Sequence, residues 1–401
     1  MRARRLATAG AGALGGFVAG AVVTLALQGG ASIPEFAPTP APTAPPVIST
    51  PERPDTYLAW TAGGLPDGFA EAVDGALDLR RIVVVASDTT WLTRSFDDDG
   101  EVVDDPPPTF AIPLEVAAVD PNAYAPFLPP ADRSLTVALG DGQGVLGESS
   151  AKLRGLGVGS VLRFGAREVE IAGILPDELV GAHELLVSRD VGAALGVTHD
   201  RYALLVPRGE PATRALTNQI RRALPAGTLL RVRAPGDTPY FRQGDAVLPP
   251  VIIKELFGEF AAKPRAGAPG YLTLDPAWVR SHIATEHVPI LGDVTCNVAM
   301  FPQIRGVIAE LQDRGLADTI SSFSGCFSAR RLNRIPTAGI SHHSWGIALD
   351  LNVSKNYFGD PPNQDPRLVA VFERWGFIWG GTFIQPDGMH FEYRRAPQQD
   401  G

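Results

Sequence analysis

Two short stretches near the C-terminal end constrain this chain more than any others. Residues 341–350 read SHHSWGIALD, and residues 387–392 read DGMHFE. Together they offer two histidines and a carboxylate, His343, Asp350 and His390. A tetrahedral catalytic zinc ion takes three protein ligands of these types and keeps its fourth position for water. The sequence therefore predicts a zinc (Zn2+) centre, and a domain that brings the two stretches together.

The residues around the carboxylate predict a strand. In residues 347–352, IALDLN, the alternation places Ala348, Asp350 and Asn352 on one face and apolar side chains on the other. An aspartate on a hydrophobic strand is costly unless it is paired or bound to a cation. A second strand is predicted over residues 377–381. This pattern favours a ligand role for the aspartate.

A further carboxylate, Asp387, stands three residues before His390. A carboxylate close to a metal and its attacking water can take a proton from that water and pass it to the leaving amine. Asp387 is therefore the candidate general base, and the predicted chemistry is hydrolysis of a peptide bond.

The order of these residues resembles a known family. The motif S-x-H-x-x-G-x-A-x-D, followed by W-G-G and D-x-M-H-F-E, is similar to the zinc D-alanyl-D-alanine carboxypeptidases. It is most similar to the VanY-type carboxypeptidases and the phage L-alanyl-D-glutamate endolysins, and the likeness begins near residue 257. The resemblance implies that His343, Asp350 and His390 bind zinc and that Asp387 is the general base. The family spacing selects His343, and His342 is expected to point the other way.

The resemblance also implies residues on the substrate side of the site. It assigns an arginine that holds the substrate carboxylate or the developing oxyanion to Arg330, with Arg331 as the fallback. A guanidinium suits an anion of either kind. Ser341 is expected to fix the loop geometry, and Trp345 and Asn352 are expected to line the cleft. These three are the predicted substrate-binding residues.

The N-terminal part carries an export signature. Residues 1–5 hold three arginines, and residues 6–27 hold no charged residue. Residues 1–32 are predicted to be either an uncleaved membrane anchor or a signal peptide cut near Gly29-Gly30-Ala31. Both alternatives place the rest of the chain outside the cytoplasm. Residues 33–54 are rich in proline and predict an extended spacer.

Two folded regions are expected after the spacer. The first, residues 55–240, has no catalytic signature; residues 241–270 form a linker, and residues 271–401 form the zinc peptidase domain. The first region predicts buried strands at 81–86 and 135–139, a hairpin over 157–175 and a helix at 214–224. In the second, residues 304–314 predict an amphipathic helix.

The fold class expected is α+β. The C-terminal peptidase domain has a small antiparallel sheet flanked by helices, and a separate mixed α/β extracytoplasmic domain precedes it. Residues 135–205 resemble the extracytoplasmic domains of MacB- and FtsX-like membrane proteins. That resemblance implies a spacer or interaction module with room for a protein partner, and no chemistry.

The net charge and the two cysteines limit which other kinds of site and partner the chain can have. A formal net charge of −9 gives no support to nucleic-acid binding, which requires a basic face. The two cysteines, Cys296 and Cys326, are expected to pair if the chain is exported; the alternative is two buried free thiols. Two thiols without a C-x-x-C spacing exclude a Cys-only zinc site.

Two functions are consistent with these patterns. The first is a zinc peptidase that acts on peptidoglycan stem peptides, by trimming a terminal D-alanine or by cutting an internal bond. The second is a membrane-anchored, non-catalytic scaffold that binds wall peptides. A full set of three ligands with an acidic residue beside it favours the enzyme, because a binding protein has no use for a proton shuttle.

Overall fold

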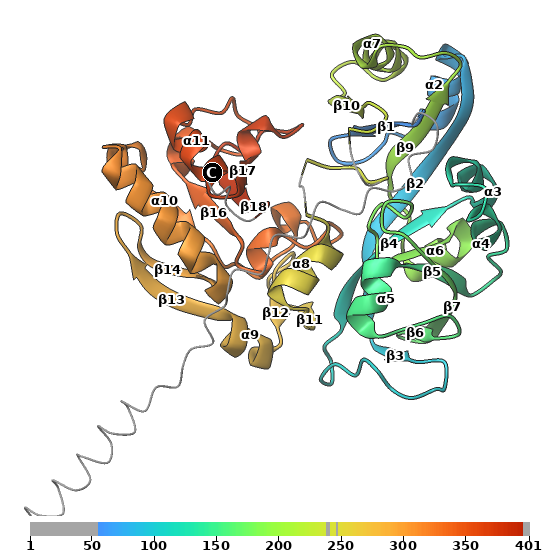
Figure 1. Ribbon diagram of the computed structural model, residues 1–401, viewed down its shortest axis with the longest axis horizontal. Coiled ribbons are helices and arrows are strands. Elements are labelled where there is room, and N and C mark those ends of the chain that lie inside the picture. Colours follow the sequence, from blue (N-terminus) through green and yellow to red (C-terminus); the bar gives the residue numbers. More distant parts are fainter. Residues whose placement is uncertain (1–54, 238–240, 246–247, 396–401) are drawn as a thin grey trace, which may run out of the picture. The chain divides into compact units, whose positions relative to one another are not determined.

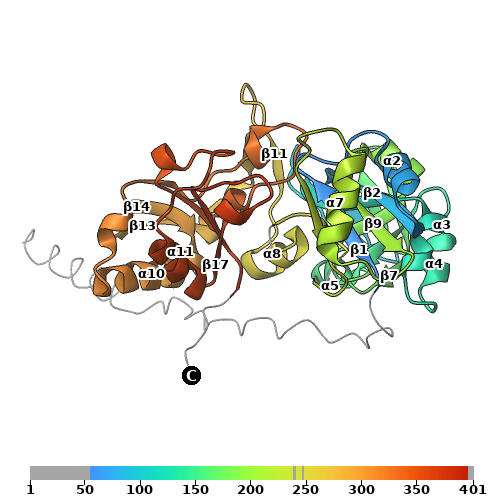
Figure 2. The same cartoon turned by 90° about the horizontal axis from the view of Figure 1, so that it is seen from above.

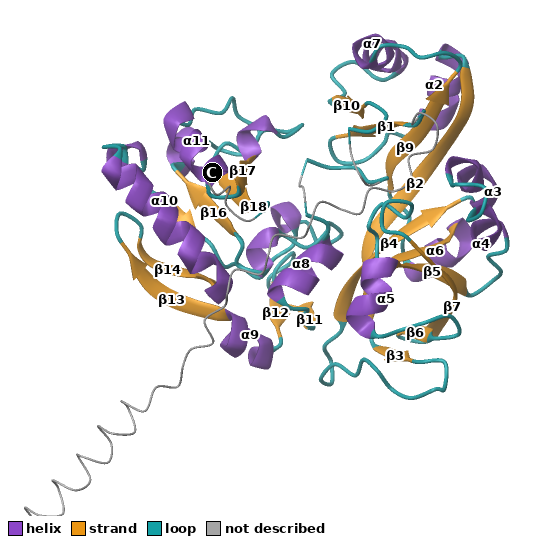
Figure 3. Ribbon diagram, viewed as in Figure 1, coloured by secondary structure: helices purple, strands orange, loops and turns teal. Residues whose placement is uncertain are grey.

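The computed structural model describes residues 55–237, 241–245 and 248–395. The predicted anchor or signal peptide (1–32) and the spacer (33–54) lie outside the described residues. Among the described residues, no helix is both long enough and apolar enough to span a membrane. The predicted α+β class is confirmed (Figures 1 and 3).

The first of the two predicted domains, residues 55–240, contains among its described residues a ten-stranded mixed sheet in the order β10-β1-β9-β2-β4-β8-β5-β7-β6-β3. Two neighbouring pairs, β4–β8 and β5–β7, are parallel and the others antiparallel. The strands are β1 (Tyr57–Thr61), β2 (Leu79–Leu92), β3 (Arg94–Phe96), β4 (Ile112–Val119), β5 (Gln143–Gly147), β6 (Val161–Phe164), β7 (Arg167–Leu175), β8 (Leu185–Ser188), β9 (Asp200–Pro207) and β10 (Leu230–Arg233). The helices are α2 (Phe69–Ala76), α3 (Pro121–Tyr124), α4 (Arg133–Val137), α5 (Glu148–Arg154), α6 (Arg189–Leu195) and α7 (Thr213–Ala223).

Most sequence predictions for this domain are confirmed. Residues 81–86 lie in β2, the hairpin over 157–175 is β6–β7, and α7 matches the predicted helix. The predicted strand at 135–139 is wrong, because residues 133–137 form the short helix α4. Periodicity cannot distinguish a strand from a buried helical turn in so short an apolar run.

The second domain contains two hairpins and a four-stranded antiparallel sheet in the order β15-β16-β18-β17. Its strands are β11 (Ala262–Pro264), β12 (Leu272–Leu274), β13 (Ile283–Val288), β14 (Gly292–Asn297), β15 (Phe323–Gly325), β16 (Ala348–Leu351), β17 (Phe377–Trp379) and β18 (His390–Tyr393). Its helices are α8 (Pro250–Phe257), α9 (Pro276–His282), α10 (Phe301–Asp313) and α11 (Pro366–Arg374).

Local sequence explains where these helices begin. Asp275 caps α9 by accepting the amide of Ala277 at 2.9 Å, and Asp365 caps α11 by accepting the amide of Arg367 at 2.8 Å. In each case a proline follows the cap, where its missing N–H costs nothing and its fixed φ suits the helix. Pro250 begins α8 in the same way, inside the predicted linker 241–270.

The core of the second domain covers one face of its sheet. The apolar face of α10, from Ile304 to Leu311, is buried as predicted, and α10 packs beside α11 (Figure 2). Leu349 and Leu351 of β16 and Phe391 of β18 are all fully buried in the same cluster. Each such side chain contributes about 1.5–3 kcal/mol on burial. The opposite face of these two strands is left for polar residues.

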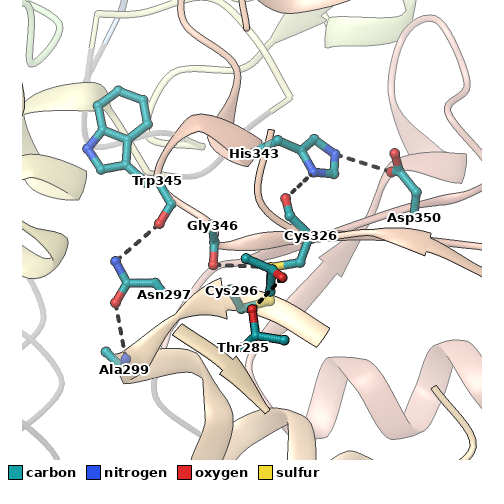
Figure 4. The surroundings of a disulfide bond; sticks show 10 residues. Thr285, Cys296, Asn297, Ala299, Cys326, His343, Trp345, Gly346 and Asp350 are labelled. Carbon is teal, nitrogen blue, oxygen red and sulfur yellow. Dashed lines mark hydrogen bonds and ion pairs between the residues drawn. A yellow bond between two sulfur atoms is a disulfide. The ribbon is translucent and has the colours of Figure 1, made fainter. Parts of the chain in front are cut away.

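The two cysteines are joined. Cys296 at the end of β14 and Cys326 just after β15 form a disulfide, which settles the alternative of free thiols (Figure 4). Closing a loop of this length stabilises a fold by about 3–4 kcal/mol in the chain-entropy account. The bond ties the β13–β14 hairpin to the segment that leads toward the predicted site.

An ion cluster lies buried where α8 and the residues after it meet α5 and β8. Its members are Arg154, Glu184, Lys254 and Glu259. Lys254 Nζ lies 2.7 Å from Glu184 Oε1 and 2.9 Å from Glu259 Oε1, and Arg154 Nη2 lies 3.0 Å from Glu184 Oε1. Burial favours the neutral form of Glu259, but the charges of Lys254 and Arg154 lower its pKa to about 2. Each charge in this cluster has an opposite partner.

Candidate metal centre

The pairing of β16 with β18 places two of the predicted ligands side by side. Asp350 is directly opposite His390, and Ala348 is opposite Glu392. Residues opposite each other in an antiparallel pair have Cβ atoms about 4.5–5.5 Å apart and lie on the same face. The alternation ends at Asn352, whose φ of 55° is left-handed, so this residue does not continue the face of Asp350 as the sequence pattern had predicted.

The third predicted ligand comes from the turn before β16. His343 lies in the 3₁₀ turn His342–Ser344, and its Nδ1 lies 2.7 Å from the carbonyl oxygen of Cys326 (Figure 4). The chain then bends at Gly346, where φ is 68° and a Cβ would lie 2.6 Å from the amide nitrogen of Asn297. Only glycine fits this bend. The bend at Gly346 and the hydrogen bond to the carbonyl of Cys326, which the disulfide holds in place, together fix the His343 imidazole beside β16.

The three side chains converge on one point. His343 Nε2 lies 3.3 Å from His390 Nδ1, and Asp350 Oδ1 lies 3.3 Å from the former and 3.2 Å from the latter. Zinc bonds to nitrogen and oxygen of roughly 2.0–2.2 Å imply ligand-to-ligand distances of about 3.3–3.5 Å on a tetrahedron. The donor set therefore fits one face of a tetrahedral zinc site.

The outer hydrogen bonds decide which ring nitrogens face this point. His343 Nδ1 donates to the Cys326 carbonyl, and His390 Nε2 donates to Glu392 Oε2 at 3.1 Å. Each ring then turns a lone pair toward the carboxylate of Asp350. Three acceptors that face one another require a positive charge between them. Outer partners of this kind orient metal-bound imidazoles in proteins.

The pKa values show the same need for positive charge. Burial favours neutral Asp350, but the two imidazoles hold the pKa of its carboxyl well below the usual range. Burial lowers the pKa of His343. Burial has the same effect on His390, yet Asp350 and Glu392 raise its pKa to about 10. A proton on His390 therefore supplies the charge unless a metal ion displaces it.

His342 also contributes, contrary to the expectation that it would point away. Its Nδ1 lies at an ion-pair distance of 2.7 Å from Glu392 Oε2, the oxygen that accepts from His390 Nε2, without the geometry of a hydrogen bond. Successive side chains in a 3₁₀ turn are about 120° apart, whereas they are opposed in a strand. The sequence pattern had predicted a strand-like segment here. His342 is thus an outer partner of the site that the sequence pattern missed.

Asp387 lies in the turn that leads into β18. Its amide donates to Gly380 at 2.9 Å, and its carbonyl accepts the amide of His390 at 3.1 Å. A Cβ on Gly380 would lie 3.2 Å from the Cβ atoms of both Asp387 and His390, so only glycine fits beneath this turn. Burial raises the pKa of Asp387, and its Oδ1 is buried without a hydrogen-bond partner among the described residues. A carboxylate oxygen left free next to the candidate ligands suits a proton acceptor.

Arg330 lies next to these groups. Its backbone is held by Ser344, whose Oγ accepts from the Arg330 amide at 3.0 Å and donates to the Arg330 carbonyl at 2.8 Å. Burial lowers the pKa of its guanidinium, while the nearby charges of Asp350 and Asp387 raise it. The fallback residue, Arg331, is 7% exposed and its guanidinium lies 5.2 Å from the ring of Trp91, so it is engaged elsewhere.

The predicted substrate-binding residues are placed differently from the candidate ligands. Trp345 is 1% exposed in the hydrophobic core, and its indole donates to the Gly258 carbonyl at 3.2 Å. Ser341 is 2% exposed, and its amide donates to the Arg330 carbonyl at 3.1 Å. Ser341 therefore lies at the entry to the 3₁₀ turn, and Trp345 lies on the core side of it.

Asn352 has its amide group fully engaged. Its oxygen accepts the Ser321 amide at 2.7 Å, and its nitrogen donates to Thr319 at 2.8 Å and to Gln364 at 2.9 Å. It lines a pocket of about 560 Å³ whose lining includes none of the three candidate ligands. In this structure Asn352 organises the loops around β16.

Solved structures similar to the chain cover a little under half of it. They are the extracellular domain of the noncanonic ABC-type transporter YknZ from Gram-positive bacteria, the periplasmic region of MacB from Actinobacillus actinomycetemcomitans, and a domain of a putative permease protein from Porphyromonas gingivalis. Identities are 14%, 11% and 16%, with 45%, 45% and 47% of this chain and 100%, 88% and 93% of those chains covered. The predicted MacB-like resemblance recurs among them, at TM-scores of 0.30 that carry no argument about the first domain.

The comparison by sequence points to the second domain. Among curated proteins, none matches the chain. Residues 335–393 match a family model described as D-alanyl-D-alanine carboxypeptidase. That range holds His343, Asp350, Asp387 and His390, and it ends just past Glu392. The segment that carries the convergent cluster is therefore similar to the D-alanyl-D-alanine carboxypeptidases, as predicted, and this match supports a peptidase.

Proposed function

We propose that this protein is a zinc-dependent peptidase that hydrolyses peptidoglycan stem peptides outside the cytoplasm, as a D-alanyl-D-alanine carboxypeptidase or an L-alanyl-D-glutamate endopeptidase. The observation that carries the proposal is the convergence of three acceptor atoms, from His343, Asp350 and His390, at tetrahedral ligand spacing. Two nitrogens and one carboxylate oxygen are ligands that zinc accepts readily.

The remaining chemistry follows from the side chains around this cluster. A zinc ion held by the three ligands would act as a Lewis acid, which lowers the pKa of the attacking water and polarises the carbonyl of the scissile peptide bond. Asp387, with its free Oδ1, accepts a proton from the attacking water and later delivers it to the leaving amine. Arg330 offers its guanidinium to the negative charge that develops on the carbonyl oxygen. Glu392 and the Cys326 carbonyl hold the two imidazoles in the required tautomers.

Two features favour a location outside the cytoplasm. The buried disulfide is typical of proteins from oxidising compartments. The predicted export signature and spacer at residues 1–54 agree with it. In this proposal a membrane segment or spacer holds the enzyme near its wall substrate, and the first domain serves as a spacer or binds a protein partner.

The test is incubation of the purified protein with defined muropeptides, with products identified by mass spectrometry. Loss of a single alanine, abolished by chelator and restored by zinc, is the result expected of a carboxypeptidase. Cleavage between L-alanine and D-glutamate identifies the endopeptidase instead. Absence of any product from zinc-loaded protein contradicts the proposal and favours the non-catalytic scaffold.

A further inference from the structure

Three arginines gather beside the candidate metal centre. The arginine cluster consists of Arg265, Arg330 and Arg334, grouped around Tyr271. The guanidinium carbons of Arg265 and Arg334 lie 5.5 and 5.6 Å from the centre of the Tyr271 ring. Arg334 Nε donates to the Tyr271 hydroxyl at 2.7 Å, and the backbone of Tyr271 pairs with that of Arg330. Arg265 Nη2 also donates to the Leu272 carbonyl at 3.1 Å, so the tip of the β11–β12 hairpin and the loop after Arg330 bring these three arginines around one tyrosine.

The loop that carries Arg334 is held in an unusual conformation. Asn333 and Arg334 have φ values of 51° and 58°, a left-handed pair that costs free energy in non-glycine residues. The loop lies directly against Gly270, where a Cβ would come within 1.9 Å of the Arg334 carbonyl oxygen. Such conformations persist where the surroundings enforce them and cluster at binding sites. The backbone therefore fixes the direction of Arg334.

The arginine cluster forms no ion pair within the described part of the chain. None of its three guanidinium groups forms an ion pair with another described residue, whereas Arg374 and Arg305 of the same domain pair with Glu310 and Glu286. Burial lowers the pKa of Arg330. The negative charges of Asp350 and Asp387 raise this pKa, and the positive charge of Arg334 lowers it. In a chain of net charge −9, these three cations form a local positive patch beside the candidate metal centre. A bound anion would complement this patch, because guanidinium groups bind carboxylates through paired hydrogen bonds.

We propose that Arg334 and Arg265 form a specificity subsite for a second carboxylate of the peptide substrate, distinct from the group that Arg330 serves. The inference rests on the proposed peptidase function and narrows it to anionic peptides. Stem peptides fit this requirement, because their D-glutamyl residue carries a free carboxylate in addition to the C-terminal one. Leu332 and Ile335, each 49% exposed, flank Arg334 and offer apolar contact to the neighbouring parts of such a peptide.

The test uses two synthetic pentapeptides, L-alanyl-γ-D-glutamyl-L-lysyl-D-alanyl-D-alanine with the D-glutamyl carboxylate free or amidated. The wild-type protein is expected to have a kcat/KM about tenfold higher for the free form, through KM, because a charged hydrogen bond is lost in the amide. Arg334→Gln should remove this preference and leave the amidated peptide unchanged. Arg280→Gln, which removes an exposed arginine of α9, is the matched control and should keep it.

Binding gives a measurement that does not depend on turnover. Calorimetry of the free-form peptide with zinc-loaded Asp387→Ala, and with Asp387→Ala carrying Arg334→Gln, should show about tenfold weaker binding in the double variant. Gly270→Ala should weaken binding of the same peptide without any change of charge, because the added Cβ displaces the loop that carries Arg334.

Three results would overturn the subsite: no preference in the wild type, an equal loss on both peptides in Arg334→Gln, or unchanged binding in the double variant. Hydrolysis of neither peptide by the wild type contradicts the peptidase itself. The calorimetric comparison still decides the subsite in that case.

Discussion

Two buried polar clusters in the described part of the chain differ in how their charges are arranged. In the ion cluster, Lys254 and Arg154 lie among the carboxylates of Glu184 and Glu259, and each charge has an opposite partner. In the ligand cluster, His343, Asp350 and His390 turn acceptor atoms toward one another at 3.2–3.3 Å. The charges of the first cluster balance one another, whereas the second needs a proton or a metal ion between its acceptor atoms.

This difference separates a structural role from a functional one. A buried ion pair with both partners present contributes to specificity of the fold and binds nothing further. A buried group of acceptors without a donor is unfavourable on its own and becomes favourable when a cation enters. Variants in the two clusters should therefore separate zinc binding and activity from the free energy of unfolding.

The largest expected effect is on turnover. Asp387→Asn keeps the shape of the side chain but removes the proton acceptor, so kcat should fall by about 10²–10⁴-fold. Zinc content should stay at the wild-type level, because Asp387 lies beside the candidate ligands and is not one of them. Steady-state hydrolysis and metal analysis on the same preparation measure both quantities. Loss of zinc with loss of activity would show that Asp387 has been given the wrong role.

The next effect is on stability. Glu184→Gln leaves Lys254 and Arg154 with one fewer carboxylate in a fully buried place, and should lower the free energy of unfolding by about 3–5 kcal/mol. Glu255→Gln, on the same helix as Lys254, is the control, because the pair of Glu255 with Lys152 is exposed and its loss should cost less than about 1 kcal/mol. Denaturant unfolding measures both. Zinc content should not change in either folded variant; a drop would mean that the two clusters are coupled.

Acid should weaken the ion cluster over a defined range. The pKa of Glu259 is lowered to about 2 in the folded protein from 4.5. The contribution of this carboxylate to stability is therefore fully present above about pH 4.5 and is lost as the pH falls toward 2. Glu259→Gln should make unfolding less dependent on pH in this range. The same dependence in the variant would contradict the assignment.

The smallest expected effect is the release of a proton from the ligand cluster when zinc binds, which has no counterpart in the ion cluster. Asp350 and Glu392 raise the pKa of His390 to about 10, so at pH 8 the empty cluster holds a proton that a metal ion must displace. Zinc binding should release about one proton per chain. Calorimetry in two buffers of different ionisation enthalpy gives this number. Binding without proton release would show that the cluster does not accept its positive charge at His390.

The site was more predictable from the sequence than its surroundings were. The alternation around Asp350 predicted the strand that carries it, β16, since strand period is a local property. The second predicted strand, 377–381, matches β17, whereas β18, which places His390 opposite Asp350, was not predicted. His342 was assigned to the wrong side because a 3₁₀ turn and a strand start look alike in sequence. The burial of Trp345 could not be predicted, because it depends on Phe260 and Gly258 from a distant segment.

The same limit applies to larger features. The apolar residues of α10 gave a clear helical period, and the helix lies where it was predicted. Residues 135–139 were too few for a period to emerge, and residues 135–137 belong to the short helix α4 instead of a strand. The ion cluster was not predicted at all, because Arg154, Glu184 and Lys254 are far apart in sequence and carry no motif.

Metal analysis of the wild-type protein and of His390→Ala tests the central claim most directly. Both proteins would be stripped with chelator, supplied with zinc and dialysed before measurement. One zinc ion per wild-type chain, and none in a His390→Ala chain that remains folded by circular dichroism, is the predicted result. A wild-type protein that retains no zinc, or a variant that retains as much as the wild type, would contradict the assignment of this cluster as the metal centre.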